Sequence, residues 1–540
     1  MLGQMMDFPL TIPAILEHGY SVFPHKEIIS YLPDKSIHRY TYADLYKRSK
    51  KLMYALVVKL GVKRGDMVAT FAWNHYQHME LYFGIPGAGA VCHTVNIRLS
   101  PQQTEFIINN AEDRFVFVDA SLVPLLEPIA LLLNTVEQFF VINAGPGFST
   151  SLKNWMHYED LIDDCPDDYP WIAVDEKEAS GMCYTSGTTG LPKGALYSHR
   201  STCLHSLAVA LPNVGNLTSA DRALLVVPQF HVMAWGMPYA AVMSGVVLVL
   251  PSCHLQPEPL IEMIISEKVN KASGVPTIWH GVYLMMKQRG IKDFPIKEFL
   301  VGGAAAPPSM IRNFEKDFGI TMIHAWGMTE TSPVATVSRL HPEHENLSEA
   351  EKLSLRSMQG QVPPFVQIRI VTENGDIAAH DGKTIGEIQV RGPWIIDSYF
   401  KTASMESFSE DGWLRTGDVG SINGDGYLQI TDRAKDLIKS GGEWISSVAL
   451  EVSLMAHPKV REASVIAIPD DKWSERPLAL VVLKDEKDPV APDELKEFLA
   501  GSFAKYQIPD KFVFPKEIPK TSVGKFDKKK MRQWYAEGQL

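Results

Sequence analysis

The sequence has few cysteines and lacks the long apolar runs of a membrane protein. Its five cysteines are scattered and form no C-x-x-C pair; they are Cys92, Cys165, Cys183, Cys203 and Cys253. This spacing argues against a disulfide scaffold or a structural zinc site and predicts a reducing compartment. No stretch reaches the roughly 18 apolar residues of a membrane-spanning helix. The opening MLGQMMDFPL lacks the basic and apolar regions of a signal peptide. We therefore expect a cytoplasmic protein.

Basic residues are also in deficit. Lys and Arg number 52 against 63 Asp and Glu, a formal net charge of −11, which disfavours nucleic acid as a partner. From Arg433 to the C-terminus, however, 19 basic residues face 17 acidic ones. A terminal domain of this charge suits a lid over anionic ligands, although small domains also vary in charge by chance.

The 540 residues show no internal repeat or low-complexity segment and exceed what one core can organise, so two or more domains are expected. Residues 40–60 carry apolar residues at helical spacing, with Thr41 as the predicted N-cap. Short apolar runs recur between helical segments, at 68–74, 115–121, 223–228, 246–251 and 299–304. Strands that alternate with helices predict parallel sheets packed in layers.

Beyond about residue 360, polar and apolar residues alternate and Asn-Gly or Asp-Gly turns separate the runs, which predicts hairpins. These runs are 366–377, 386–392 and 426–432. The last part predicts strands at 463–470 and 478–485 and helices at 493–505 and 527–536.

The predicted fold class is α/β. We expect a large multi-layer N-terminal domain, residues 1–431, made of two α/β subdomains and a β-rich subdomain. A small mobile α+β lid domain, residues 432–540, would follow it. We place the boundary, and the hinge of the lid, at Asp432.

Residues 184–194, YTSGTTGLPKG, combine three glycines with hydroxyls and a lysine. Glycine lets backbone N–H groups approach an anion closely, and hydroxyl and lysine side chains add donors to phosphate oxygens. The spacing is not that of a Walker A loop, and a flexible surface loop is the alternative interpretation. The predicted phosphate cradle consists of Thr185, Ser186, Gly187, Thr188, Thr189, Gly190 and Lys193.

Four further motifs follow: HAWGMTE at 324–330, LRTGDVG at 414–420, DRAKDLIKSGGEWIS at 432–446 and PKTSVGKFDK at 519–528. With the loop, they resemble in type and order the signatures of the adenylate-forming superfamily. That superfamily contains acyl-CoA synthetases, firefly-type luciferases and the adenylation domains of peptide synthetases. The opening MLGQMM, the stretch VVPQFHVMAWGMPY and the segment GGEWIS resemble bacterial medium- and long-chain fatty acyl-CoA synthetases. The resemblance runs from end to end.

The resemblance implies an ATP site in which Thr185 and Glu330 also serve as catalytic Mg²⁺ ligands. It implies that Trp326, where the family usually has tyrosine, stacks on adenine; tryptophan keeps the π face and loses the hydroxyl. Asp418 is implied to bind the ribose, with Arg433 as a second ribose or phosphate contact. Taken alone, Glu330 could equally be a surface carboxylate, and Asp418 a turn residue. The other implied nucleotide-binding residues are Gly302, Gly303, Gly327, Met328, Thr329 and Lys525.

The lid motifs imply two successive arrangements. In one, the catalytic Lys525 contacts the carboxylate and the α-phosphate, although by composition it could belong to a solvated basic face. In the other, rotation at Asp432 brings up a path for CoA formed by Lys439, Ser440, Gly441, Gly442, Glu443 and Trp444. Ser447 and Ala449 stand where many members have a proline and an acidic residue, which bears on the packing of the hinge loop.

His231 and Trp235 resemble the catalytic histidine beside the acyl carboxylate and the aromatic gate of the fatty acid tunnel. Their four-residue spacing puts both on one face of a predicted helix, which also fits core aromatic residues. The implied activity joins a medium- to long-chain fatty acid to ATP, releases pyrophosphate and then transfers the acyl group to CoA. Its implied cofactors are ATP, Mg²⁺ and CoA.

Three alternatives remain open at this stage. One is a ligase for 3-methylmercaptopropionate or another short acid, and another is an acyl-AMP ligase that loads a carrier protein. The third, from a different class, is a non-catalytic nucleotide sensor, although the intact set of predicted site residues argues against it: Thr185, Lys193, Glu330, Asp418, Arg433 and Lys525. The resemblance is compatible with a homodimer and with peripheral membrane contact, but no residue pattern marks either surface.

Overall fold

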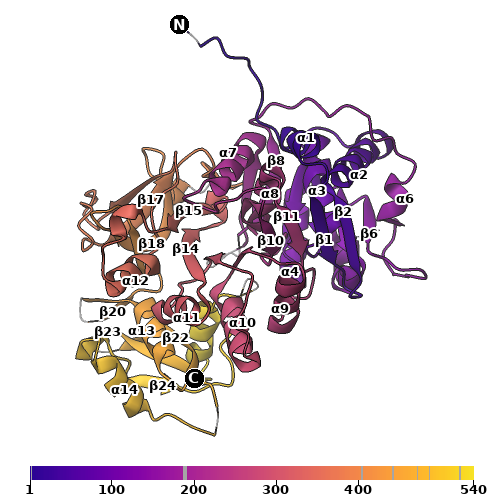
Figure 1. The fold of residues 1–540 in the computed structure, drawn as a ribbon. Coiled ribbons are helices and arrows are strands. Elements are labelled where there is room, and N and C mark those ends of the chain that lie inside the picture. The colour runs from indigo at the N-terminus through magenta and orange to yellow at the C-terminus, as the bar shows by residue number, and fades with distance from the viewer. Residues whose placement is uncertain are drawn as a thin grey trace.

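The computed structural model describes residues 1–540 apart from 2, 186–190, 403–404, 441–442, 471, 486 and 522–523. Across the described residues the strands form four sheets, and helices cover them in layers (Figure 1). Within the same residues, no helix combines the length and the apolar composition needed to cross a membrane.

The first sheet is mainly parallel. Its strands lie in the order β7 (Trp155–His157), β6 (Gln138–Ile142), β5 (Phe115–Asp119), β3 (Met67–Phe71), β4 (Val91–Thr94), β8 (Ala179–Tyr184) and β9 (Gly194–Ser198). The last pair is antiparallel, so that β8 and β9 form a hairpin that carries the predicted phosphate cradle at its turn. The predicted strands at 68–74 and 115–121 are confirmed as β3 and β5, and both are buried on both faces, as in a parallel sheet.

The second sheet has parallel inner strands and an antiparallel pair at each edge. Its order is β15 (Val334–Ser338), β14 (Thr321–Gly327), β13 (Glu298–Val301), β12 (Lys271–Gly274), β10 (Arg222–Leu225), β11 (Val247–Leu250), β1 (Glu27–Tyr31) and β2 (Ile37–Thr41). The predicted strands at 223–228, 246–251 and 299–304 are confirmed as β10, β11 and β13. The strand order reverses between β10 and β12, a topological switch point at which α/β sheets bind ligands beyond the carboxyl ends of the strands.

Helices fill the space between these two sheets and cover their outer faces. One core unites both sheets with α1 (Ile12–Val22), α2 (Tyr42–Tyr54), α3 (Tyr76–Gly87), α7 (His199–Ala210) and α8 (Met237–Ser244). The outer face of the second sheet carries α9 (Pro257–Ser266), α10 (Pro276–Arg289) and α11 (Pro308–Phe318). The outer face of the first carries α4 (Pro101–Ala111) and α5 (Val123–Leu126). Two further helices are α6 (Tyr158–Ile162) and α12 (Glu349–Ser357). The predicted layers are therefore confirmed, and Thr41 caps α2 in a capping box with Asp44.

The predicted hairpins form a third, antiparallel sheet. It runs β16 (Gln367–Val371), β17 (Gly386–Arg391), β18 (Leu414–Ile422) and β19 (Leu428–Arg433). Gly375 and Gly426 take φ of +88° and +80° in its turns, a backbone region that favours glycine. The core of this sheet includes Trp326 and Ala335 of the second sheet, which joins the two sheets beside the cavity described below.

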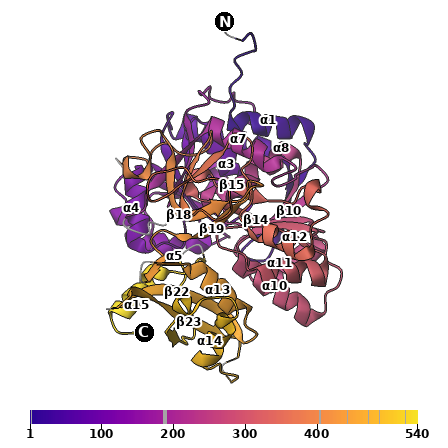
Figure 2. The same ribbon diagram turned by 90° about the vertical axis from the view of Figure 1, so that its left-hand side faces the viewer.

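The fourth sheet belongs to the C-terminal part, which both views show as a separate lobe (Figures 1 and 2). Its strands are β21 (Glu443–Ile445), β20 (Ile438–Ser440), β23 (Ser474–Leu483) and β22 (Val460–Asp470), with β24 (Lys511–Val513) beside β23. Its helices are α13 (Ser447–Ala456), α14 (Pro492–Ala500) and α15 (Lys528–Ala536). The helix predicted at 493–505 is shorter in the structure, so its predicted end is wrong. α14 ends at Ala500, and Gly501, a poor helix former, is its C-cap residue.

One carboxylate attaches this lobe to β19. Asp432 is 1% exposed, and its Oδ2 accepts hydrogen bonds from the backbone N–H groups of Ser447 at 2.6 Å and Val448 at 3.3 Å. It therefore neutralises the N-terminus of α13 as a capping carboxylate does. The serine at 447 matters here, because a proline would lack the N–H group that this contact uses.

A buried ion pair lies next to this attachment. Lys528 Nζ lies 2.8 Å from Glu451 Oε1, and their side chains are only 11% and 8% exposed. The same carboxylate oxygen accepts hydrogen bonds from the Ser464 hydroxyl at 3.0 Å and the Val465 N–H at 2.7 Å. Lys528 also donates to the Ser447 hydroxyl, which in turn donates to Asp432, so the contacts connect α15, α13 and β19.

We predict that Lys528→Met destabilises the C-terminal lobe by about 3–5 kcal/mol, because Glu451 would remain buried without its cation. Urea unfolding followed by fluorescence, together with hydrogen exchange of the α13 amides, measures the effect. Lys529→Met, at the neighbouring exposed lysine, is the matched control and should leave both unchanged. Equal exchange protection in the two variants would contradict the predicted role of the pair.

Candidate functional site

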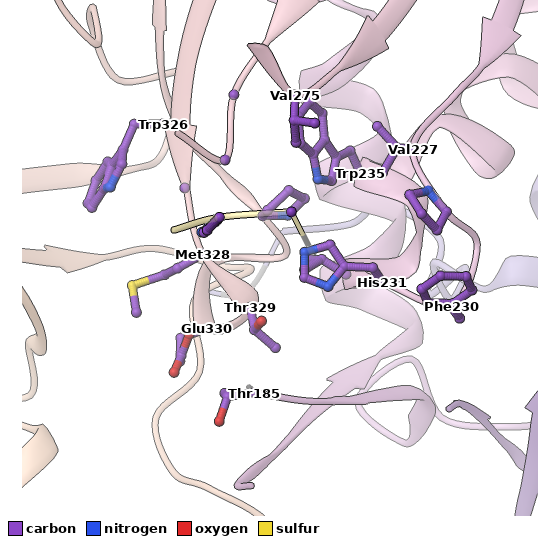
Figure 3. A pocket seen from close by; sticks show the side chains of 18 of the residues that line it. Thr185, Val227, Phe230, His231, Trp235, Val275, Trp326, Met328, Thr329 and Glu330 are labelled. Carbon is purple, nitrogen blue, oxygen red and sulfur yellow. The ribbon is translucent and has the colours of Figure 1, made fainter. Parts of the chain in front are cut away.

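A cavity of about 1370 Å³ lies beyond the carboxyl ends of β10, β12, β13 and β14, at the switch point of the second sheet. Figure 3 shows Trp326, Met328, Glu330 and Thr185 on one side of it and His231 and Trp235 on the other. The predicted site residues that line it are Thr185, Lys193, His231, Trp235, Gly302, Gly303, Trp326, Gly327, Met328, Thr329, Glu330, Arg433 and Lys525. Residues from five separate motifs thus meet in one space.

The predicted phosphate cradle sits at the β8–β9 turn. The N–H of Thr185 donates to the Lys193 carbonyl at 2.9 Å, and the N–H of Lys193 donates to the Thr185 hydroxyl at 3.3 Å. These two bonds close the base of the loop and direct both residues to the cavity. Ser186, Gly187, Thr188, Thr189 and Gly190 lie outside the described residues, so their role stays a prediction.

Asp418 lies just behind the cavity wall and links two elements. It is 6% exposed, and its Oδ2 accepts a hydrogen bond from the indole N–H of Trp326 at 2.8 Å. Its Oδ1 lies 3.2 Å from Nε of Arg433. Where the family usually has a tyrosine hydroxyl, Trp326 therefore presents an indole N–H. This N–H group orients the Asp418 carboxylate.

Glu330 is a buried carboxylate and not a surface one. It is 6% exposed, and burial raises its pKa, whereas a hydrogen bond from the Tyr399 hydroxyl to Oε1 at 2.6 Å lowers it. Tyr399 also presents its ring 4.9 Å from the Lys193 ammonium. Tyr399 thus holds both a predicted metal ligand and a predicted phosphate contact.

Close backbone approach explains two of the glycines. A Cβ atom at Gly327 would lie 1.7 Å from the Pro333 carbonyl oxygen, so no other residue fits at that bend of β14. A Cβ atom at Gly302 would lie 3.0 Å from the Ala325 carbonyl and 3.3 Å from the Trp235 ring. The absence of side chains at these positions keeps this part of the cavity open.

Lys525 reaches the cavity from the C-terminal lobe. Its Cε lies 3.8 Å from where a Cβ of Gly303 would stand. Removal from water and the nearby Arg433 cation lower the pKa of Lys525 to about 8, while Asp418 and Glu330 oppose the shift. Lys525 is therefore a member of the site and not of a solvated basic face.

His231 is a neutral imidazole. Removal from water, and the positive charges of Lys525 and Arg98, lower its pKa to about 3. It can exchange hydrogen bonds with a ligand at neutral pH, but it supplies no charge. The positive charge on this side of the cavity comes from Lys525 and Arg98.

The prediction that His231 and Trp235 share a face of a right-handed helix is wrong. From Val232 to Gly236 the φ angles are all positive, from 37° to 73°, so the chain makes a left-handed turn. Four of these residues are not glycine, and each carries about 1–2 kcal/mol of backbone strain. The turn is held by Met233, whose Sδ accepts a hydrogen bond from Thr94 at 3.9 Å, and by Gly236, where a Cβ would lie 2.5 Å from the His205 ring.

The predicted CoA residues lie elsewhere. Lys439 and Ser440 belong to β20, and Glu443 and Trp444 to β21, and these four do not line the cavity. Lys439 Nζ lies 4.9 Å from the ring of Trp444, which is 42% exposed. Gly441 and Gly442 lie outside the described residues. The CoA path stays a prediction that requires a different position of the lobe.

Sequence reasoning missed two residues of the cavity. Tyr399 comes from the irregular segment after β17, 69 residues from the carboxylate that it binds, and no motif marks it. Arg98 lies before α4, with its guanidinium 5.9 Å from the Phe230 ring. A single basic residue outside any motif is too common a pattern to have identified it.

We predict that Lys525 titrates near pH 8 in the free protein, measured by amine labelling at a series of pH values and mass spectrometry. Arg433→Gln should raise this pKa, because a neighbouring like charge is removed. Asp418→Asn should lower it, because the opposite charge is removed. A pKa of Lys525 that does not respond to either substitution would contradict this arrangement of charges.

Proteins of known activity resemble the chain over its whole length. A long-chain-fatty-acid–CoA ligase of Thermus thermophilus is 45% identical over 98% of this chain and 96% of its own. A 3-methylmercaptopropionyl-CoA ligase of Ruegeria lacuscaerulensis is 43% identical over 99% of both chains. The crystal structure of an anthranilate CoA ligase in complex with anthranoyl-AMP matches with a TM-score of 0.88, at 25% identity over 99% of both chains.

Family models cover both parts of the molecule. Residues 16–400 match the model described as AMP-binding enzyme, and residues 449–525 match the AMP-binding enzyme C-terminal domain. The first match spans both α/β sheets and the cavity residues up to Tyr399, and the second ends on Lys525. The chain belongs to the AMP-binding enzyme family.

Proposed function

We propose that this protein is an ATP-dependent acyl-CoA ligase for medium- to long-chain fatty acids. A carboxylate and ATP would give acyl-AMP and pyrophosphate, and acyl-AMP and CoA would then give acyl-CoA and AMP. The observation that carries this proposal is the convergence of Lys525, from the lid, on a cavity shared by Glu330, Thr185 and His231. The curated relatives, which are CoA ligases for carboxylic acids, support the reaction type.

The side of the cavity around Trp326 is the proposed nucleotide site. Adenine would stack on Trp326, and the ribose hydroxyls would bind Asp418, whose carboxylate is already oriented by the indole. Arg433 would add a second contact to the ribose or a phosphate. The β8–β9 loop, with Lys193 at its end, would bind the distal phosphates through donors that face the cavity.

The donors beside the loop fit Mg²⁺. A carboxylate and a hydroxyl, Glu330 and Thr185, are oxygen ligands of the kind that Mg²⁺ takes, usually together with substrate phosphates and water. In the part of the chain that the structure describes, no group of three or more His, Cys, Asp or Glu could hold a metal alone. This agrees with an ion carried by the nucleotide. When bound, Mg²⁺ would neutralise phosphate charge.

The acid would lie between His231 and Lys525. Both reactants of adenylation are anions, so a cation aimed at the developing charge is the main requirement of the step. Lys525 supplies it, and the neutral imidazole of His231 can bind the carboxylate or the acyl carbonyl. The alkyl chain would leave the polar end along the apolar side of the cavity, towards Trp235.

The second half-reaction would use a rotated lid with its hinge at Asp432. A thiol must reach the carbonyl from a direction that the lid and Lys525 occupy in this arrangement. The Asp432 carboxylate is bound to α13, so it would move with the lid while its backbone stays paired with β18. The exposed β20–β21 hairpin with Trp444 would then face the cavity and form the CoA path.

Chain length distinguishes the proposal from its main alternative. Relatives of nearly equal similarity act on long-chain fatty acids and on 3-methylmercaptopropionate. An assay of CoA consumption across acids of increasing length, with the sulfur-containing acid included, decides between them. Pyrophosphate release without CoA consumption would point to carrier-protein loading, and no release with any acid would point to a nucleotide sensor. A cytoplasmic location belongs to the same proposal and is supported by the five unpaired cysteines.

We predict that Lys525→Ala lowers acyl-AMP formation by about two to three orders of magnitude or more, since it removes the cation of the adenylation step. Conversion of synthetic acyl-AMP and CoA to acyl-CoA should be retained. The two half-reactions are measured separately, with Lys529→Ala, at an exposed lysine of the same segment, as control. Equal loss of both half-reactions would contradict the assignment of Lys525 to adenylation.

We predict that Asp432→Pro blocks the CoA step and spares adenylation, because proline fixes φ at the proposed hinge. The substitution also removes the carboxylate that caps α13, so Asp432→Ala is the matched control: it loses the carboxylate but keeps φ free. Asp432→Ala should retain the CoA step in the same half-reaction assays. If the proline variant turns over as fast as the alanine variant, rotation at this residue is not required.

A further inference from the structure

A second, smaller cavity of about 40 Å³ lies behind the gate residue Trp235. Trp235, Leu300 and Val334 line both this chamber and the large cavity, so they form the wall between the two spaces. We call the smaller space the distal chamber. The indole packs on Gly302, at 3.3 Å from the position of its missing Cβ, and no side chain of residue 302 holds it in place.

The sides of the distal chamber are apolar apart from the Ser273 hydroxyl. It lies between the inner face of the second sheet and α7–α8, with Val209 and Met237 on the helix side and Ile323 on the sheet side. These three apolar side chains are buried, with exposed fractions of 9% or less. Such walls would make apolar contacts with the alkyl chain of an acid that extends past Trp235.

The far end of the distal chamber is closed by charges. Lys271 begins β12, Glu298 begins β13 and Arg339 follows β15, and all three line the chamber. Arg339 makes a bidentate ion pair with Glu298, at 3.0 and 3.1 Å, and its Nε donates to the Val214 carbonyl at 3.0 Å. Lys271 pairs with the same carboxylate. The three side chains are between 11% and 19% exposed, so the cluster separates the chamber from solvent at the amino edge of the sheet.

We propose that this Lys271–Glu298–Arg339 cluster sets the upper limit of acyl chain length. The inference rests on the proposed function and names the residues that select among its substrates. The terminal methyl group of a bound acyl chain can pack against Trp235 and the apolar walls of the distal chamber. At the cluster it would contact paired charges, to which it can offer no hydrogen bond. The bidentate geometry and the bond to Val214 also fix Arg339, so the end wall does not yield as an apolar side chain would.

Arg339→Ala tests the proposal. Arg339 is the member of choice because its removal leaves Glu298 still paired with Lys271, whereas removal of Glu298 would leave two cations unpaired. In the CoA-consumption assay with saturated acids of increasing length, kcat/KM should rise about tenfold or more for the first acids beyond the wild-type limit. Acids shorter than that limit should change little.

A matched control lies on the same edge of the same sheet. Arg222 begins β10, pairs with Glu267 at 3.2 Å and does not line the distal chamber. Glu267 keeps Arg39 as a partner when Arg222 is removed, as Glu298 keeps Lys271. Arg222→Ala should therefore leave the length profile of the wild type unchanged.

A second variant fills the chamber from the other side. Val209→Phe, on α7, should lower kcat/KM about tenfold or more for the longest wild-type substrates and spare short ones. This measurement decides the matter if Arg339→Ala does not fold. An unchanged length profile in a folded Arg339→Ala or Val209→Phe variant would overturn the inference. The proposed function itself would fail if the wild type consumed CoA with none of the acids tested, or only with the short sulfur-containing acid.

Discussion

The buried carboxylate of Asp418 is the contact on which the arrangement of the site depends. It lies on β18 of the third sheet, accepts the indole N–H of Trp326 from the second sheet and pairs with Arg433 at the end of β19. β18 and β19 are paired neighbours in the third sheet, whereas β14 belongs to the second, so the carboxylate ties the two sheets together. Because the carboxylate is 6% exposed, loss of Arg433 would remove the cation that pairs with its charge, and loss of the indole would leave Oδ2 without that donor. The carboxylate thus fixes the Trp326 side of the cavity relative to the third sheet, which leads into the C-terminal lobe.

Charge in the cavity is balanced for anionic ligands. Lys525 lies close to a second cation, Arg433, and both face a space from which water is partly excluded, so the pKa of Lys525 falls to about 8. Asp418 and Glu330 offset this only in part. On the proposed function, the phosphates of ATP and the carboxylate of the acid would supply the missing negative charge, and the protonated form of Lys525 would then be favoured. This links closure of the lid to the presence of the reactants, since the lid carries the cation.

The side of the cavity proposed to bind the acid depends on backbone shape more than on charge. The left-handed turn at residues 232–236 places Trp235 against Gly302 and between two cavities, an orientation that a right-handed helix would not produce. Met233 and Gly236 hold the strained turn through contacts with β4 and α7. Strain of this kind is commonly found where function requires a residue to move or to be held in one position. Behind the indole, the paired charges of Lys271, Glu298 and Arg339 end the apolar space.

The sequence by itself determined most element types and the layers, and it predicted a set of residues that share one cavity. Local patterns are sufficient for these: alternation and turn glycines mark β16–β19, and Thr41 marks the start of α2. The motifs predict Thr185, Glu330, Arg433 and Lys525, which line the cavity, and Asp418, which lies behind its wall. The predicted end of α14 was wrong because Gly501, a poor helix former, ends the helix earlier. The helix expected at Trp235 was wrong because the packing of Met233 holds the chain in a left-handed turn.

Only the tertiary structure decided which charges are buried and what they touch. The bond from Tyr399 to Glu330, the indole bond to Asp418 and the cluster behind Trp235 join residues 69, 92 and up to 68 positions apart. No local pattern records such pairs, because each depends on which strands lie side by side or on how separate segments pack together. The pKa of Lys525 and the neutral state of His231 follow from the same packing, since removal from water and neighbouring charge exist only in the folded chain.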